Sequence, residues 1–168
     1  MNWLVLKLRS KLNTKMKDKP QTECRNRKHL PYRGNALRWD LFRLRDAWRE
    51  SRRQHDRFSI FKYLSVVFDL VMVWKKENQA IGRATRALRL KHRAYGNTIE
   101  PFAAIINCTT SRKVVDVKAR SKWAHALMFA EKYKSPDESL EEFIRRNGGI
   151  NLCVVKLSRL GRSKPRPR

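Results

Sequence analysis

Apolar residues recur with helical spacing along the chain from about residue 35 onward. In a first segment, expected to begin near Asn35, the apolar positions Leu37, Leu41, Leu44 and Trp48 follow one another at steps of four, three and four. Such steps place side chains on one face of an α-helix. We therefore predict an amphipathic helix whose other faces carry arginines with acidic residues between them.

The segment 58–74 is the most apolar part of the chain. At about 100° per residue its polar positions fall in one narrow stripe, formed by Lys62, Ser65 and Asp69 and continued by Lys76. The length is at the lower limit for a transmembrane helix, and each charge at the bilayer centre would cost about 2.5–3.5 kcal/mol. We expect the central helix of a bundle, with this stripe at the surface, and regard a membrane partner as improbable.

A third helix is predicted from Glu77 to Arg93. Its inner face would hold Ile81, Ala84 and Leu88, and its opposite face Arg86, Arg89 and Arg93, with Arg83 and Lys91 at the edges. Each pair of like charges three or four residues apart destabilises a helix by about a few tenths of a kcal/mol. Either a phosphate-bearing partner offsets this cost or the face is merely solvated; the fork geometry of guanidinium groups favours phosphate.

Capping signals divide the rest of the chain into short helices. After a turn at Gly96, Pro101 suits the first turn of a helix over 102–108, and Asp116 is an expected N-cap for a helix to about Lys134. Ser135-Pro136-Asp137-Glu138 predicts the next start by its N-cap serine, proline and capping-box glutamate. That helix should end at Gly148-Gly149, and a last one should span 150–160. The expected core positions are Phe102, Ile105, Ile106, Trp123, Leu127, Ala130, Leu140, Phe143, Ile144, Ile150, Cys153, Val154, Leu157 and Leu160.

Together these segments predict an all-α fold, a single irregular helical bundle of about five to six helices over residues 34–160. We expect a basic N-terminal arm over 1–33, either an amphipathic surface helix, an organellar presequence or a nucleic-acid arm, and a flexible basic tail over 161–168. The last two helices, joined by glycines, could form a helix-turn-helix whose second helix enters the major groove; plain packing of two helices is the competing interpretation.

The charge changes the functional picture most. Forty Lys and Arg face fifteen Asp and Glu, a net charge of +25. Residues 1–33 hold ten basic and two acidic side chains and residues 156–168 six and none, whereas 99–155 hold nine and seven. An uneven distribution of this kind indicates a packed module with separate basic contact surfaces, for which a polyanion is the natural partner.

From Pro101 onward the chain resembles a group of short basic proteins of rhizobial α-proteobacteria. The similarity is carried by PFAAIINCTT, by the D-x-K-x-x-S-K-W pattern that starts at Asp116, by FIRRNGGIN and by RLGR. It implies a bacterial, cytoplasmic setting, and it provides no activity that could be carried over to this chain.

Catalytic and metal sites are not indicated. Cys24, Cys108 and Cys153 are odd in number and far apart, as expected for reduced thiols in the cytoplasm. No pair of Cys or His has zinc-ligand spacing, and no phosphate-binding glycine loop, nucleophile elbow or His-Glu-x-x-His motif occurs. We expect no enzyme activity and no cofactor.

The leading hypothesis is therefore a non-enzymatic nucleic-acid-binding protein, with DNA slightly favoured over RNA. Its expected contacts are Arg25, Arg27, Lys28, Arg83, Arg86, Arg89, Arg93, Lys156, Arg159, Arg162, Lys164, Arg166 and Arg168. Three alternatives stay open: an adaptor for an acidic protein, a binder of anionic membrane surfaces through residues 1–19, and a charge that reflects genome composition only.

Overall fold

A computed structural model describes residues 33–54, 56, 58–93 and 99–162. These residues form seven α-helices and no strand, which confirms the all-α prediction. The chain divides into two units, residues 1–31 and 32–168, and every described residue belongs to the second. The described residues form more helices than the predicted five to six, and each of the helical segments named from the sequence corresponds to one of them.

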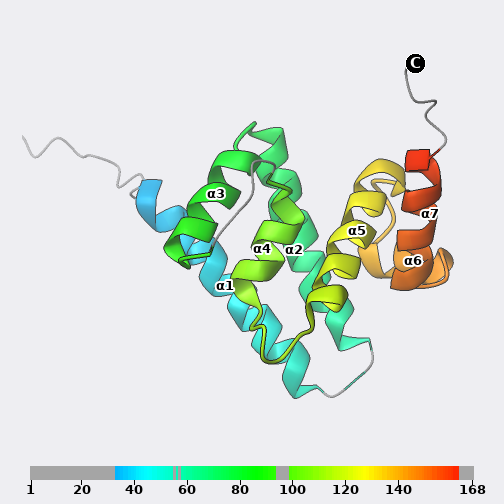
Figure 1. Ribbon diagram of the computed structural model, residues 1–168, viewed down its shortest axis with the longest axis horizontal. Coiled ribbons are helices and arrows are strands. Elements are labelled where there is room, and N and C mark those ends of the chain that lie inside the picture. Colours follow the sequence, from blue (N-terminus) through cyan, green and yellow to red (C-terminus); the bar gives the residue numbers. More distant parts are fainter. Residues whose placement is uncertain (1–32, 55, 57, 94–98, 163–168) are drawn as a thin grey trace, which may run out of the picture. The chain divides into compact units, whose positions relative to one another are not determined.

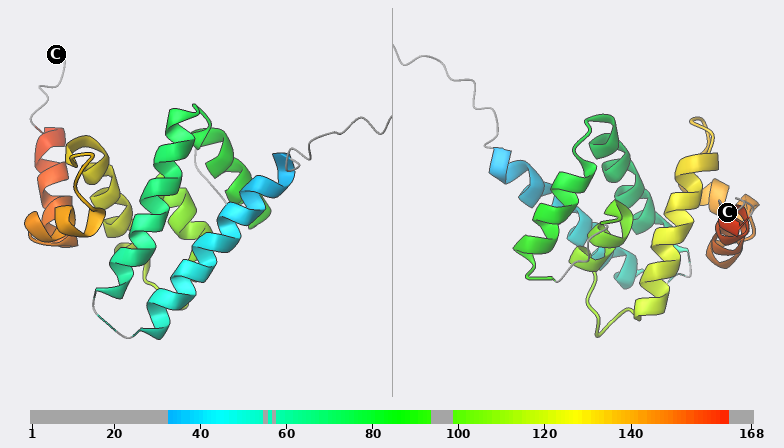
Figure 2. Two further views of the ribbon diagram at one scale, coloured as in Figure 1. Left: turned by 180° about the vertical axis from the view of Figure 1, so that it is seen from behind. Right: turned by 45° about the horizontal axis from the view of Figure 1, so that its top comes forward.

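The first two helices follow the predicted apolar patterns. α1 spans Arg33–Arg53 and α2 spans Ser59–Lys76, and Figure 2 shows them meeting at the loop that joins them. Leu37, Leu41 and Leu44 are buried in α1, as predicted. In α2 the predicted polar stripe is at the surface, with Lys62 and Asp69 exposed.

α2 is the central helix of the described unit. It contacts α1, α3 (Ala80–Leu90), α4 (Pro101–Thr109), α5 (Val117–Tyr133) and α6 (Leu140–Arg146). In Figure 1, α1, α3 and α4 lie on one side of it and α5, α6 and α7 (Ile150–Arg162) on the other. Burial of Tyr63, Leu64 and Trp74 from one helix therefore joins both sides into one hydrophobic core.

α3 is shorter than predicted, and its buried face is rotated about the helix axis relative to the predicted one. Ala84 and Leu88 are buried as expected, but Ile81 is 64% exposed. The buried face is centred on Ala80, Ala84 and Ala87, small residues that let α3 approach α4 closely. At its end, His92 adopts a left-handed conformation with φ of 48°, which stops the helix before Arg93.

Two caps agree with the sequence and one differs. Pro101 is at the start of α4, where the carboxylate of Glu100 accepts hydrogen bonds from two backbone N–H groups, and Asp116 caps α5. The predicted start of α6 at Ser135 is wrong: residues 136–138 form a turn, and Ser139 is the N-cap, in a capping box with Glu142.

The last helices end on features that the sequence marks. Gly148 and Gly149 follow α6 with φ of 85° and 92°, a conformation that glycine adopts without strain. α7 then packs mainly on α5. Cys153 is fully buried between them, whereas Leu160, predicted to be in the core, is 45% exposed.

Candidate nucleic-acid interface

The predicted contact residues that the structure describes lie in two separate places, on α3 with the segment after it and on α7. Arg25, Arg27, Lys28, Lys164, Arg166 and Arg168 lie outside the described residues, and Arg162 ends α7. Arg86 and Arg89 are exposed on α3. Lys156 and Arg159 are exposed on α7, one turn apart.

Arg83 is engaged within the protein. Its guanidinium is 2.9 Å from the carboxylate of Glu77 and 3.8 Å from that of Asp40, and Nε donates to Gln79. The same group lies over the ring of Trp74, at 5.6 Å from the centroid. These contacts fix Arg83 between α1, α2 and α3, so it is less available to an external phosphate than Arg86.

Arg93 departs from the predicted arginine face. Because α3 ends at Leu90, Arg93 leaves the helix, and it lies half-buried. There it is close enough to Cys108 and Arg120 to influence their pKa values electrostatically. A continuous helical face of Arg86, Arg89 and Arg93 is therefore not formed.

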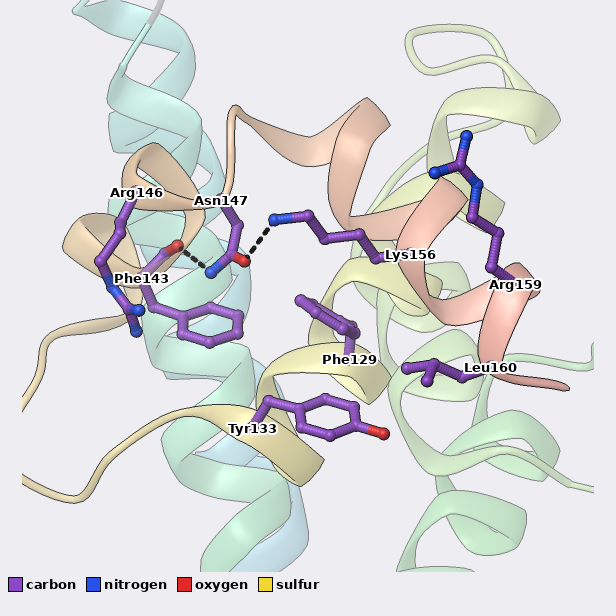
Figure 3. Close-up of a pocket in the computed structure, with 8 residues that line it drawn as sticks. All are labelled: Phe129, Tyr133, Phe143, Arg146, Asn147, Lys156, Arg159 and Leu160. Atoms are coloured by element: carbon purple, nitrogen blue, oxygen red, sulfur yellow. Dashed lines mark hydrogen bonds between the residues drawn. The ribbon is translucent and has the colours of Figure 1, made fainter. Parts of the chain in front are cut away.

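Lys156 and Arg159 border a cavity with an aromatic floor, which we call the aromatic groove. It has a volume of about 450 Å³, within the range of ligand sites. α5, α6 with its C-cap and α7 contribute the side chains drawn in Figure 3, namely Phe129, Tyr133, Phe143, Arg146, Asn147, Lys156, Arg159 and Leu160.

The floor consists of aromatic rings held against one another. Phe129 lies with its ring centroid 4.9 Å from that of Tyr133 and 5.6 Å from that of Phe143. Phe129 and Phe143 are buried, whereas Tyr133 is 49% exposed. The ring of Phe129 is tilted by 42° to each of the other two. Tyr133 is therefore the exposed ring of the floor on which a planar ligand such as a nucleobase can stack.

Hydrogen bonds position the polar rim. Lys156 Nζ donates to Asn147 Oδ1 at 2.8 Å, and Asn147 Nδ2 donates to the carbonyl oxygen of Phe143 at the same distance. Arg146 makes two hydrogen bonds, both of 2.8 Å, to the carboxylate of Glu138. These bonds lower the pKa of Glu138 and raise that of Arg146, so this arginine is already neutralised.

The carboxylates near the groove bind partners other than Lys156 and Arg159. Glu138 binds Arg146, Glu141 pairs with Arg145, and Glu142 closes the capping box of α6. In the part of the chain that the structure describes, Lys156 bonds only a neutral amide and Arg159 has no ion pair. The two side chains that carry net positive charge at the groove are thus those of α7.

The sequence predicts two of the three cations of the groove, Lys156 and Arg159, but neither Arg146 nor the aromatic floor. Phe129 and Tyr133 follow one another at i and i+4 near the end of a predicted helix, a spacing that puts both on one face. Arg120 was also missed: it lies at i−4 and i−7 from the apolar Ala124 and Leu127, a spacing that signals a buried position.

Other classes of site have no counterpart in the described residues. No group of three or more His, Cys, Asp or Glu in them lies close enough to hold a metal ion. Among these helices, none has the length and apolar character that crossing a membrane requires. In comparisons with protein-family models, with curated proteins and with solved structures, no match to this chain was found.

Proposed function

We propose that the protein binds nucleic acid, mainly through phosphate contacts and without catalysing a reaction. The observation that carries the proposal is the aromatic groove, where Lys156 and Arg159 lie beside an aromatic floor while the nearby carboxylates are already paired. Phosphates would contact the two cations, and an unpaired base or a groove edge would contact Tyr133. Arg86 and Arg89 on α3 would supply further phosphate contacts. The proposed setting is a bacterial cytoplasm, and DNA is slightly favoured over RNA as the ligand.

Charge balance supports this proposal. Ten carboxylates of the described residues cap helices or bind neighbouring side chains or backbone N–H groups: Asp40, Glu50, Asp56, Glu77, Glu100, Asp116, Glu131, Glu138, Glu141 and Glu142. Even with all fifteen acidic groups counted, the forty basic ones leave a net charge of +25. External anions must supply the remaining neutralisation, and the closely spaced phosphates of a nucleic acid do so with release of counterions.

Binding should be measured as anisotropy of labelled duplex DNA, single-stranded DNA and structured RNA across a salt series. The double variant Lys156→Gln/Arg159→Gln removes two phosphate contacts, so the slope of log K against log salt should fall by about 1.8 for duplex and about 1.4 for a single strand. The matched control is Lys118→Gln/Lys122→Gln, which removes two exposed cations near the start of α5. Equal slopes for both variants would remove the aromatic groove from the proposal.

A second candidate function, an adaptor for an acidic protein, is favoured by an exposed aromatic pair on α1. Trp39 and Phe42 are 63% and 54% exposed and form an edge-to-face pair at 5.9 Å, with the exposed Arg38 and Arg43 next to them in sequence. Exposed aromatics beside arginine are typical of protein interfaces. A partner that survives nuclease treatment and is lost with Trp39→Ala would support the adaptor; loss of all partners on nuclease treatment would exclude it.

A further inference from the structure

Arg120 is buried without enough hydrogen-bond acceptors for its guanidinium. The side chain comes from the first turns of α5, and the residue is 3% exposed. Nη1 donates to Asn107 Oδ1 at 3.0 Å, but within the described residues the buried Nε and Nη2 atoms have no acceptor. A buried polar group without a partner loses its hydration and gains nothing in return, and the penalty is larger for a charged group.

The surroundings of Arg120 increase this cost. Burial first, and then the charges of Arg112 and Arg93, lower the pKa of its guanidinium, while Asp116 opposes them. The carboxylate of Asp116 is occupied as the N-cap of α5, where it accepts the N–H of Lys118. The charges of Arg93 and Arg112 thus act on Arg120 from two other segments, and among the described residues no carboxylate binds its buried edge.

The cationic cluster extends beyond the immediate neighbours. Arg93, Lys91 and Arg45 all act on the thiol of Cys108, in α4, although burial dominates and raises its pKa to about 11. These side chains come from α1 and from the segment that follows α3. Positive charges in one region raise the local potential and attract anions.

Nε and Nη2 form one edge of the guanidinium, and their N–H bonds run parallel. This edge fits two oxygens of one anion in bidentate geometry. We propose that this edge of Arg120, together with Arg93 and Arg112, binds a small tetrahedral oxyanion of the phosphate or sulfate class. The site is separate from the aromatic groove and does not depend on the proposed nucleic-acid function.

The burial of the site selects the source of the anion. A phosphate within a nucleic acid carries its backbone with it and cannot reach atoms that have almost no exposed surface. A free inorganic oxyanion can enter when the long side chains at the rim move, since Arg112 is exposed and Arg93 is half-buried. The proposal therefore commits to a free oxyanion.

The test is thermal unfolding of the full chain in inorganic phosphate, in sulfate and in chloride at matched ionic strength. Phosphate at a hundredfold excess over its Kd should raise the Tm of the wild type by roughly 5–10 °C relative to chloride. Arg120→Met should lose this increment. In chloride alone it should unfold at the same temperature as the wild type or higher, because it removes an uncompensated buried charge.

The matched control is Lys132→Met, an exposed cation on the same helix at about 18 Å along its axis. It loses the same charge and should keep the phosphate increment, which separates a specific site from general neutralisation of a basic protein. A phosphate increment that is equal in all three proteins overturns the proposal.

Should Arg120→Met fail to fold, the Nε–H signal of Arg120 in the wild type gives a second readout. Titration with phosphate should shift this signal with saturation and slow its exchange with water, while the other arginine Nε–H signals shift linearly. An unchanged Arg120 signal overturns the proposal. A nucleic-acid phosphate as the source is tested by adding an oligonucleotide: the same saturating shift with the oligonucleotide alone would contradict a free oxyanion.

Discussion

The start of α6 offers a sharp test of the structure, because two serines four residues apart compete for the N-cap. Replacing Ser139 by Ala removes the Oγ that accepts the N–H of Glu142 at 3.2 Å and donates to its carboxylate at 2.8 Å. Replacing Ser135 by Ala removes a side chain with no hydrogen bond among the described residues; its carbonyl, which accepts from Lys134 and Glu138, stays.

The expected magnitudes differ clearly. Loss of a serine N-cap costs about 1 kcal/mol, which for a unit of this size lowers Tm by about 3–4 °C. Ser135→Ala should change the free energy of unfolding by less than about 0.5 kcal/mol, as for most surface substitutions. α6 has seven residues, too few to be helical without its caps and its packing, so the first cost should appear in full.

Urea unfolding followed by circular dichroism at 222 nm measures both variants against the wild type. The free energy of unfolding should be lower for Ser139→Ala than for Ser135→Ala, and the slope of this free energy against urea concentration should be unchanged. Equal losses, or a larger loss for Ser135→Ala, would show that the helix begins at Ser135 and that the geometry of the aromatic groove, which α6 helps to build, is different.

Three further outcomes are expected from the same structure. Burial raises the pKa of Glu100 above its unfolded value, so ionisation of this carboxylate lowers stability as pH rises through its folded pKa. The Tm of Glu100→Gln minus the Tm of the wild type, measured by calorimetry, should therefore be larger at pH 7 than at pH 4. Gly148→Ala and Gly149→Ala should both destabilise the protein in urea unfolding, because both residues have positive φ, a conformation that alanine adopts only with strain. Cys108, with its pKa raised to about 11 by burial, should react with a thiol reagent at pH 8 only after unfolding, and rapid labelling of the native protein would contradict its burial.

Periodicity alone predicts most of the fold, because burial repeats with the helix. The buried Leu37, Leu41 and Leu44 and the exposed Lys62 and Asp69 follow directly from spacing. These positions are decided by which face of a long helix is apolar, and that information is complete within the segment itself.

Helix ends are less predictable because several residues can supply the same cap. Ser135 and Ser139 are both followed three residues later by glutamate, so the sequence offers two capping boxes. The structure selects the second, which starts the helix directly at the buried Leu140. The end of α3 is similar: nothing local marks His92, whose left-handed conformation moves Arg93 out of the predicted arginine face.

Sites assembled from distant segments are the least predictable. Lys156 and Arg159 could be chosen for their charge, but their proximity to Phe129 depends on the packing of α7 against α5. Similarly, the position of Arg120 on the apolar stripe of α5 can be read from spacing, whereas Arg93 and Arg112, whose charges act on it, come from the segments that follow α3 and α4. Their convergence is a property of tertiary structure.

The central position of α2 has a consequence for synthesis of the chain. α2 ends at Lys76 and one of its covering helices, α6, begins at Leu140. At the usual pace of translation the ribosome needs roughly 3 to 13 seconds for the stretch between them. During this interval the central helix of the described unit lacks part of its cover, so the nascent chain presents a binding site for chaperones that the finished protein does not.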